Sequence, residues 1–169
     1  MFKLPIIFDK NEWFVMISMV VLLICFIAIP KIIPKSLTIT IMLFYAVFGL
    51  TADVLIGVDY PFNFYRIMDS PKLELFDVLV YVVNYSLYGY FFSYILYKWK
   101  IEIKYLLLFI LLWIALTVCL EWMSVKFNVF TYKNGWNTWF SALSYLLIFP
   151  ASAIINKVFI HFWSIKTMK

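Results

Sequence analysis

Long uncharged stretches, separated by short segments that carry charge, dominate the pattern of hydrophobic and polar positions along the chain. The five longest are residues 13–30 (18 residues), 36–52 (17), 78–97 (20), 105–120 (16) and 134–156 (23). A helix that crosses a bilayer needs about 20 predominantly apolar residues. The second and fourth stretches fall short of that length, so their helices must continue through Asp53 and Glu121 to cross. The pattern predicts five transmembrane helices.

The fold class predicted from this pattern is all-α, an integral membrane bundle of five transmembrane helices that forms a single domain over residues 1–169. Helices satisfy their own backbone hydrogen bonds, which the hydrocarbon core of a bilayer requires. We place the five helices at residues 12–30, 37–57, 76–97, 105–125 and 138–160.

Composition agrees with a membrane protein and excludes a soluble domain. Hydrophobic residues make up 66% of the chain, aromatic residues 22%, and the mean hydropathy is +0.96, whereas about half apolar is usual for soluble domains. Residues 1–11 lack the pattern of a cleaved signal peptide. Thirteen Lys against one Arg is typical of AT-rich bacterial genomes and predicts a bacterial plasma membrane.

The distribution of charge predicts the orientation of the chain. Five crossings put the termini on opposite sides, with six basic residues on the side of the N-terminus and eight on the other. By the positive-inside rule, the N-terminus is predicted outside and the C-terminus in the cytoplasm. Eight of the nine acids fall on the predicted outer side, so that half carries a net charge of −2 (six minus eight) and the inner half +7 (eight minus one).

Asp53 and Glu121 are the acids that lie beyond the first turn of a predicted helix, well inside it. A charged residue there costs at least ~2.5–3.5 kcal/mol on insertion scales, so it usually faces the bundle interior and marks function. Both acids lie near the seventeenth position of helices that run in the same direction. With the rise of an α-helix, both are about 6 Å below the same membrane face. We predict that they belong to one site.

Polar residues at helical spacing extend this pattern over four of the five helices and predict a polar chamber that opens toward the outer face. The faces are Tyr45, Gly49 and Asp53; Asp77, Tyr81, Asn84 and Tyr88; Trp113, Thr117 and Glu121; and Asn137, Ser141 and Ser144, with Ser152 and Asn156 further in. The predicted ligand-binding residues are Asp53, Glu121, Asp77, Tyr81, Asn84, Tyr88, Thr117, Tyr132, Trp136 and Ser141. In such a chamber three states of the acids are open: protonated, bound to a cation, or paired with Lys126 or Arg66. The alternative to a site is that these polar groups only join helices by hydrogen bonds.

The segment 126–141, KFNVFTYKNGWNTWFS, follows Glu121 and contains a predicted turn at Asn134-Gly135. Tyr132 and Trp136 lie close enough to Glu121 in sequence to cover the chamber, where aromatic faces would hold a lipid headgroup or a cation. Anchoring at the membrane interface is the other interpretation of these aromatic residues.

Short motifs resemble a group of small multi-pass membrane proteins of unknown function from spore-forming bacteria. They are the acid near the end of the fourth helix followed by Tyr132, Gly135-Trp136, Ser141 and Tyr145, together with Pro5…Glu12-Trp13 and Pro30-Lys31…Pro34-Lys35. The resemblance supports the topology and implies no activity.

Motifs for nucleotide, metal or prenyl-diphosphate chemistry are missing from the sequence. His161 is the single histidine, and Cys25 and Cys119 lie inside predicted helices away from any CxxC pattern. We therefore predict no cofactor, no metal and no disulfide. The Lys-rich segment 98–104 is predicted to touch anionic lipid and not nucleic acid.

Three functions fit the pattern, in this order of preference. The first is a non-enzymatic membrane protein whose acidic and aromatic chamber binds a small polar or cationic group, a lipid headgroup or a membrane partner, which includes a second copy of the chain. The second is a membrane-embedded enzyme acting on a lipid or isoprenoid, with Glu121 or Asp53 as general acid or base. The third is a small transporter, although no internal repeat is evident.

Overall fold

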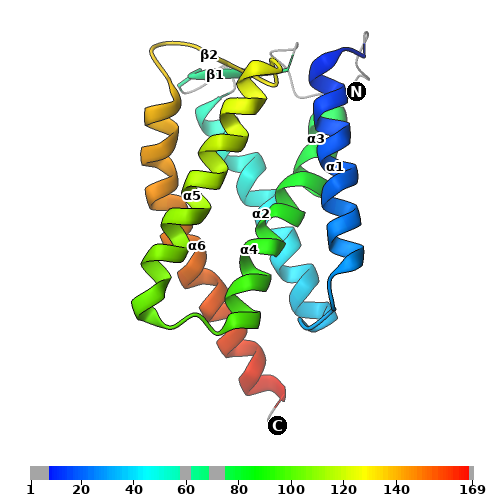
Figure 1. Ribbon diagram of the computed structural model, residues 1–169, viewed down its shortest axis with the longest axis vertical. Helices are drawn as coiled ribbons and strands as arrows, with labels where there is room; N and C mark the ends of the chain where they lie inside the picture. The colour runs from blue at the N-terminus through cyan, green and yellow to red at the C-terminus, as the bar shows by residue number, and fades with distance from the viewer. Residues whose placement is uncertain (1–7, 58–61, 69–74, 168–169) are drawn as a thin grey trace.

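The protein is described by a computed structural model that covers residues 8–57, 62–68 and 75–167. Five helical segments lie side by side and alternate in direction (Figure 1). In chain order they are α1 (Lys10–Ala28); α2 (Lys35–Ile56); a third segment made of α3 (Leu75–Val80), the π-helix η1 (Tyr81–Tyr85) and α4 (Ser86–Trp99); α5 (Ile103–Lys126); and α6 (Thr138–Thr167). Within the described residues five helices are long and apolar enough to cross a membrane, so the predicted all-α bundle is confirmed.

The ends of the helices follow local sequence signals. Before α1, the backbone N–H of Asp9 donates to Oε2 of Glu12 at 3.0 Å, and the Asp9 side chain accepts from the backbone of the first turn. This capping box satisfies N–H groups that a helix start leaves without partners, and it starts α1 at Lys10, two residues before the predicted 12. Helix α6 passes through Pro150 and runs to Thr167, beyond the predicted end at 160.

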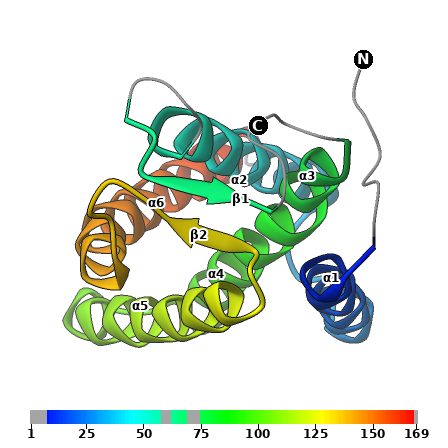
Figure 2. The same cartoon turned by 90° about the horizontal axis from the view of Figure 1, so that it is seen from above.

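A two-stranded antiparallel sheet, which the sequence did not predict, lies across one end of the bundle (Figure 2). Strand β1 (Tyr65–Ile67) follows α2 and strand β2 (Phe130–Tyr132) follows α5, and Tyr65 pairs with Tyr132. We call this end of the bundle the sheet end. The predicted turn at Asn134 and Gly135 is present beyond β2, and both residues have positive φ, 48° and 81°.

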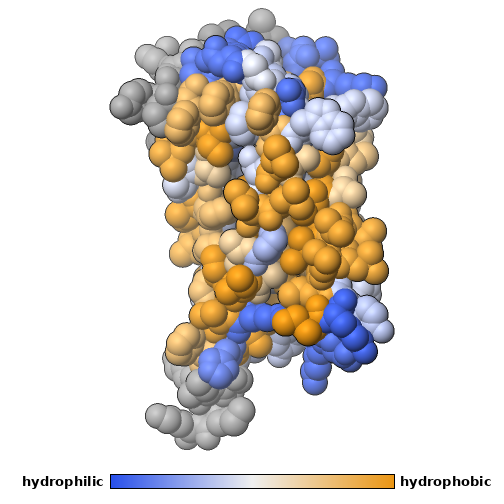
Figure 3. Space-filling view, turned by 90° about the vertical axis from the view of Figure 1, so that its left-hand side faces the viewer, coloured by the Kyte–Doolittle hydropathy of each residue, from blue (hydrophilic) through white to orange (hydrophobic). Residues whose placement is uncertain are grey.

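Packing divides the bundle into two groups of helices. The third segment packs against α1 and α2, while α5 packs against α6, and α6 also contacts α2 and α4. The main apolar core includes Ile41, Tyr90 and Phe92, which are almost completely buried. On the outside, a broad hydrophobic band separates two hydrophilic ends, as expected of a surface that faces lipid (Figure 3).

Candidate functional site

Asp53 faces the bundle interior near the sheet end of α2 and is only 7% exposed. It lies on the buried face of that helix, one turn after Gly49. The hydroxyl of Tyr65 donates to Oδ1 at 2.5 Å, and the hydroxyl of Tyr85 donates to Oδ2 at 2.7 Å. Each oxygen therefore has a hydroxyl donor, which suits an ionised carboxylate because that group accepts hydrogen bonds and donates none.

Glu121 occupies the matching place in the other group of helices and is 9% exposed. Its Oε1 accepts from the hydroxyls of Tyr132 at 2.6 Å and Ser141 at 2.5 Å, and its Oε2 accepts from the hydroxyl of Tyr145 at 2.7 Å. The indole N–H of Trp136 in turn donates to Ser141 at 3.0 Å. Three hydroxyl donors from β2 and α6 thus converge on one carboxylate, which holds both elements against α5.

The sheet connects the two carboxylates. Tyr65, which donates to Asp53, is paired across the sheet with Tyr132, which donates to Glu121. Side chains alternate between the two faces of a strand, and directly opposite residues of an antiparallel pair project to the same face. Both tyrosines therefore point from the sheet into the bundle, and each one reaches the acid on the helix that precedes its own strand.

Among the residues that the structure describes, neither Asp53 nor Glu121 forms an ion pair with Lys126 or Arg66, which was one of the predicted alternatives. Among the described residues, the ion pair found joins Lys104 to Glu102 at 2.9 Å, and both side chains are largely exposed. Lys126 lies over the ring of Trp122, with its Nζ 3.6 Å from the ring centroid. Hydroxyl groups, and not a neighbouring cation, thus contact the carboxyl groups of Asp53 and Glu121.

The π-helix η1 changes which residues of the third segment face the acids. Asn84 donates to the hydroxyl of Ser18 on α1 at 2.7 Å, and Tyr88 is bonded to Thr117 on α5 at 2.6 Å. The prediction that Asn84 and Tyr88 share one face with Tyr81 is therefore wrong, because a π-helix places its residues differently around the axis from an α-helix. Tyr85 was not among the predicted site residues, although it lies four residues after Tyr81, so the spacing that grouped Asp77 with Tyr81 would also have found it.

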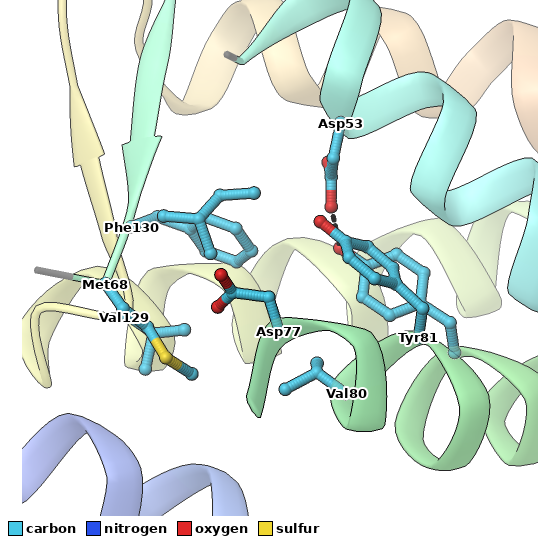
Figure 4. Close-up of a pocket in the computed structure, with 9 residues that line it drawn as sticks. Asp53, Met68, Asp77, Val80, Tyr81, Val129 and Phe130 are labelled. Atoms are coloured by element: carbon cyan, nitrogen blue, oxygen red, sulfur yellow. Dashed lines mark hydrogen bonds between the residues drawn. The ribbon is translucent and has the colours of Figure 1, made fainter. Parts of the chain in front are cut away.

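A small pocket opens beside Asp53, between the third segment and the sheet (Figure 4). Asp53, Asp77, Tyr81 and Tyr85 line one side of it, and the sheet and its flanks form an apolar wall on the other, with Ile67, Met68, Val129 and Phe130. Its cavity volume of about 20 Å³ holds about one water-sized group. Within the described residues, the free space of the predicted chamber is therefore small. Glu121 is not among the residues that line it.

The tyrosines of the sheet are held in their neutral form. Burial, together with the charge of Asp53, raises the pKa of Tyr65 far above its ordinary value. Burial, followed by the hydrogen bond to Glu121, raises the pKa of Tyr132 to about 12. Both hydroxyls therefore keep their protons at neutral pH and remain donors to the carboxylates.

Two glycines make room for the rings that reach Asp53. A Cβ atom on Gly49 would lie 2.2 Å from the ring of Tyr85, and one on Gly57 would lie 2.5 Å from the ring of Tyr65. Any larger side chain would push these rings away, because real contacts of a Cβ atom are not that short. Glycine at positions 49 and 57 thus lets the rings of Tyr85 and Tyr65 lie close enough to bond Asp53.

A second polar group lies deeper in the bundle. Asn156 on α6 donates to the hydroxyl of Tyr45 at 2.7 Å and accepts from the hydroxyl of Ser93 at 2.7 Å. Its amide also donates to the backbone oxygen of Ser152 at 2.9 Å. These groups satisfy one another, as expected of hydrogen bonds that join membrane helices.

Most of the predicted site residues lie at the sheet end, in two clusters. Asp53, Asp77 and Tyr81 line the pocket; Tyr132, Trp136 and Ser141 belong to the hydrogen-bond network of Glu121. Thr117 is bonded to Tyr88 away from both carboxylates. Tyr145 is one helical turn after Ser141, so the spacing rule that identified Ser141 would also have found it.

Comparison with known proteins found no matching family model, no matching curated protein and no matching solved structure. The resemblance to small membrane proteins of spore-forming bacteria therefore stays a prediction, and the function rests on the geometry of the site.

Proposed function

We propose that this multi-pass membrane protein binds a small monovalent cation, or the protonated amine of a small molecule, in the pocket beside Asp53. The observation that carries the proposal is the pocket itself. Among its described lining residues, two are acids, Asp53 and Asp77, and none is Lys, Arg or His. Both acids are at least nine-tenths buried.

Charge and size both support this class of ligand. A buried carboxylate is costly unless an opposite charge or good hydrogen bonds compensate it, and a cation in the pocket would place a positive charge beside Asp53. The free volume excludes a whole lipid headgroup in this conformation, since only about one water-sized group fits. The ring of Phe130 in the apolar wall would add cation–π attraction.

The direct test measures thermal stability of the protein in lipid nanodiscs with increasing concentrations of sodium, potassium, ammonium, methylammonium or choline. A ligand that binds only the folded state stabilises it by about 2.7 kcal/mol at a hundred times its dissociation constant. We expect stabilisation by at least one of the small cations. Choline serves as the control, because its trimethylammonium group is too large for the pocket.

Two variants connect any such effect to the pocket. Asp53→Asn and Asp77→Asn each remove one negative charge from its wall, and each should abolish the stabilisation or weaken it strongly. Glu102→Gln is the matched control, because it removes one negative charge from an exposed acid that precedes α5, at the opposite end of that helix from β2. Equal responses of wild type and both pocket variants to every cation would refute the proposal.

The membrane-embedded enzyme and the small transporter stay predictions. For transport, a cation would need further polar groups below Asp53, and the deeper group around Asn156 is satisfied by bonds among its own members. Cation binding without transport is therefore the function that the geometry supports best.

A further inference from the structure

Glu121 does not line the pocket, yet its hydrogen bonds hold part of the pocket wall. Val129, which directly precedes β2, and Phe130, the first residue of β2, form the side of the pocket that faces Asp77 (Figure 4). Tyr132, at the end of the same strand, donates to Glu121 at 2.6 Å. The position of this wall therefore depends on a bond to an acid that lies outside the pocket.

We propose that Glu121 is a positioning residue, which sets the affinity of the pocket for its cation by holding the sheet in place. This inference rests on the proposed function of the pocket. It assigns different roles to the two acids that the sequence placed in one site: Asp53 contacts the ligand, and Glu121 acts through Tyr132.

Through the sheet, the bond between Tyr132 and Glu121 also affects the surroundings of Asp53. Tyr132 is paired with Tyr65, and Tyr65 donates to Asp53 at 2.5 Å. A shift of β2 would therefore move β1 as well. The hydroxyl of Tyr65, which donates to Asp53, would move with it. Beyond the paired residues, the backbone N–H of Met68 donates to the oxygen of Val129 at 2.8 Å, so the two sides of the apolar wall are also connected.

The bond to Glu121 is one of two ties between the segment of β2 and α5; the other is the backbone N–H of Val129, which donates to the oxygen of Ser124 at 2.8 Å. All three donors to this carboxylate are hydroxyls, and hydrogen bonds to a charged group are roughly twice as strong as those between neutral groups. Tyr145 and Ser141 belong to α6, so of the three donors Tyr132 alone connects the carboxylate to the sheet. Loss of that one bond should loosen the pocket wall while α6 stays attached to α5.

The test compares three variants in the cation titration described above. Tyr132→Phe keeps the charge of Glu121 and removes the bond to the sheet, and we expect about tenfold weaker cation binding from it. Glu121→Gln removes the charge as well, and its binding should be weakened at least as much. Tyr145→Phe is the matched control, because it removes one donor to the same carboxylate without touching the sheet, and its affinity should stay within about twofold of wild type.

A disulfide between the two strands tests whether fixing the sheet restores the cation affinity that Tyr132→Phe loses. Arg66 and Thr131 are directly paired residues of β1 and β2, at a separation typical of antiparallel strands that permits a disulfide. In a chain whose native cysteines are replaced by serine, the oxidised pair Arg66→Cys/Thr131→Cys should restore most of the affinity lost in Tyr132→Phe. If Tyr132→Phe binds as wild type does, or if Tyr145→Phe loses as much, Glu121 does not act through the sheet.

A readout without any cation keeps this inference separate from the proposed function. Val129 is 5% exposed, so a cysteine at that position reacts with a maleimide only when the wall opens. Tyr132→Phe should raise the labelling rate of Val129→Cys several-fold, and the disulfide should return it to the original rate. Unchanged labelling overturns the positioning role, even where cations bind. Faster labelling in a protein that binds no cation refutes the function of the pocket and leaves the control of the wall by Glu121 standing.

Discussion

Replacement of Gly49 by alanine tests whether the ring of Tyr85 lies where the geometry of the site requires it. The new Cβ atom would lie 2.2 Å from that ring, so the ring must move away from α2. Its hydroxyl would then lose the 2.7 Å bond to Oδ2 of Asp53. One methyl group thus disturbs both the packing of the third segment and the hydrogen bonds of a buried acid.

Three contributions determine the expected free-energy change for Gly49→Ala. Overpacking of a well-filled interior costs about 1–3 kcal/mol, and loss of a hydrogen bond to a charged group costs about 1.5–3 kcal/mol. The higher helix propensity of alanine returns about 1 kcal/mol. The sum lies between about 1.5 and 5 kcal/mol, so we expect Gly49→Ala to destabilise the protein by about 3 kcal/mol.

The assay is reversible unfolding in mixed micelles, followed by far-UV circular dichroism, for Gly49→Ala, Tyr85→Phe and the double variant. Phenylalanine keeps the ring and removes the hydroxyl, so the clash remains and the hydrogen bond is already lost. Gly49→Ala should therefore cost about 1.5–3 kcal/mol less in the Tyr85→Phe background than in wild type. A neutral or stabilising Gly49→Ala, or the same cost in both backgrounds, would refute the placement of the ring.

Three further predictions concern the sheet, the deeper polar group and the orientation. Folding raises the pKa of Tyr132 from about 10 to about 12, so the folded state binds the hydroxyl proton more tightly than the unfolded state does. The resulting stabilisation is present below pH 10 and is lost as the pH rises toward 12. In Tyr132→Phe, the free energy of unfolding should not show this loss between pH 10 and 12. Asn156→Ala should destabilise the bundle by about 1–3 kcal/mol in the same micelle assay, since it leaves the buried hydroxyl of Tyr45 without its donor. For the orientation, a membrane-impermeant maleimide should label Asn134→Cys and not Glu102→Cys in intact cells, both in a chain without native cysteines; the opposite pattern would invert the predicted topology.

The sequence by itself determined the five helices and the burial of the acids on them. A transmembrane helix satisfies its backbone groups within one segment, so the length of each apolar stretch and the position of its charges suffice to place it. On α2, which is α-helical throughout, the rule that residues four apart share a helix face correctly put Tyr45, Gly49 and Asp53 on one buried face. Glu121, on the equally regular α5, was likewise expected to face inward and does so.

Only the tertiary structure decided what surrounds those acids. Tyr65 and Tyr132 are far apart in the chain, and they meet through a short sheet whose pairing depends on two separate connections and not on either strand alone. The π-helix likewise redirected Asn84 to α1, a change that an α-helical period does not contain. Contacts of this kind form between segments, so the periodicity of any one segment carries no information about them.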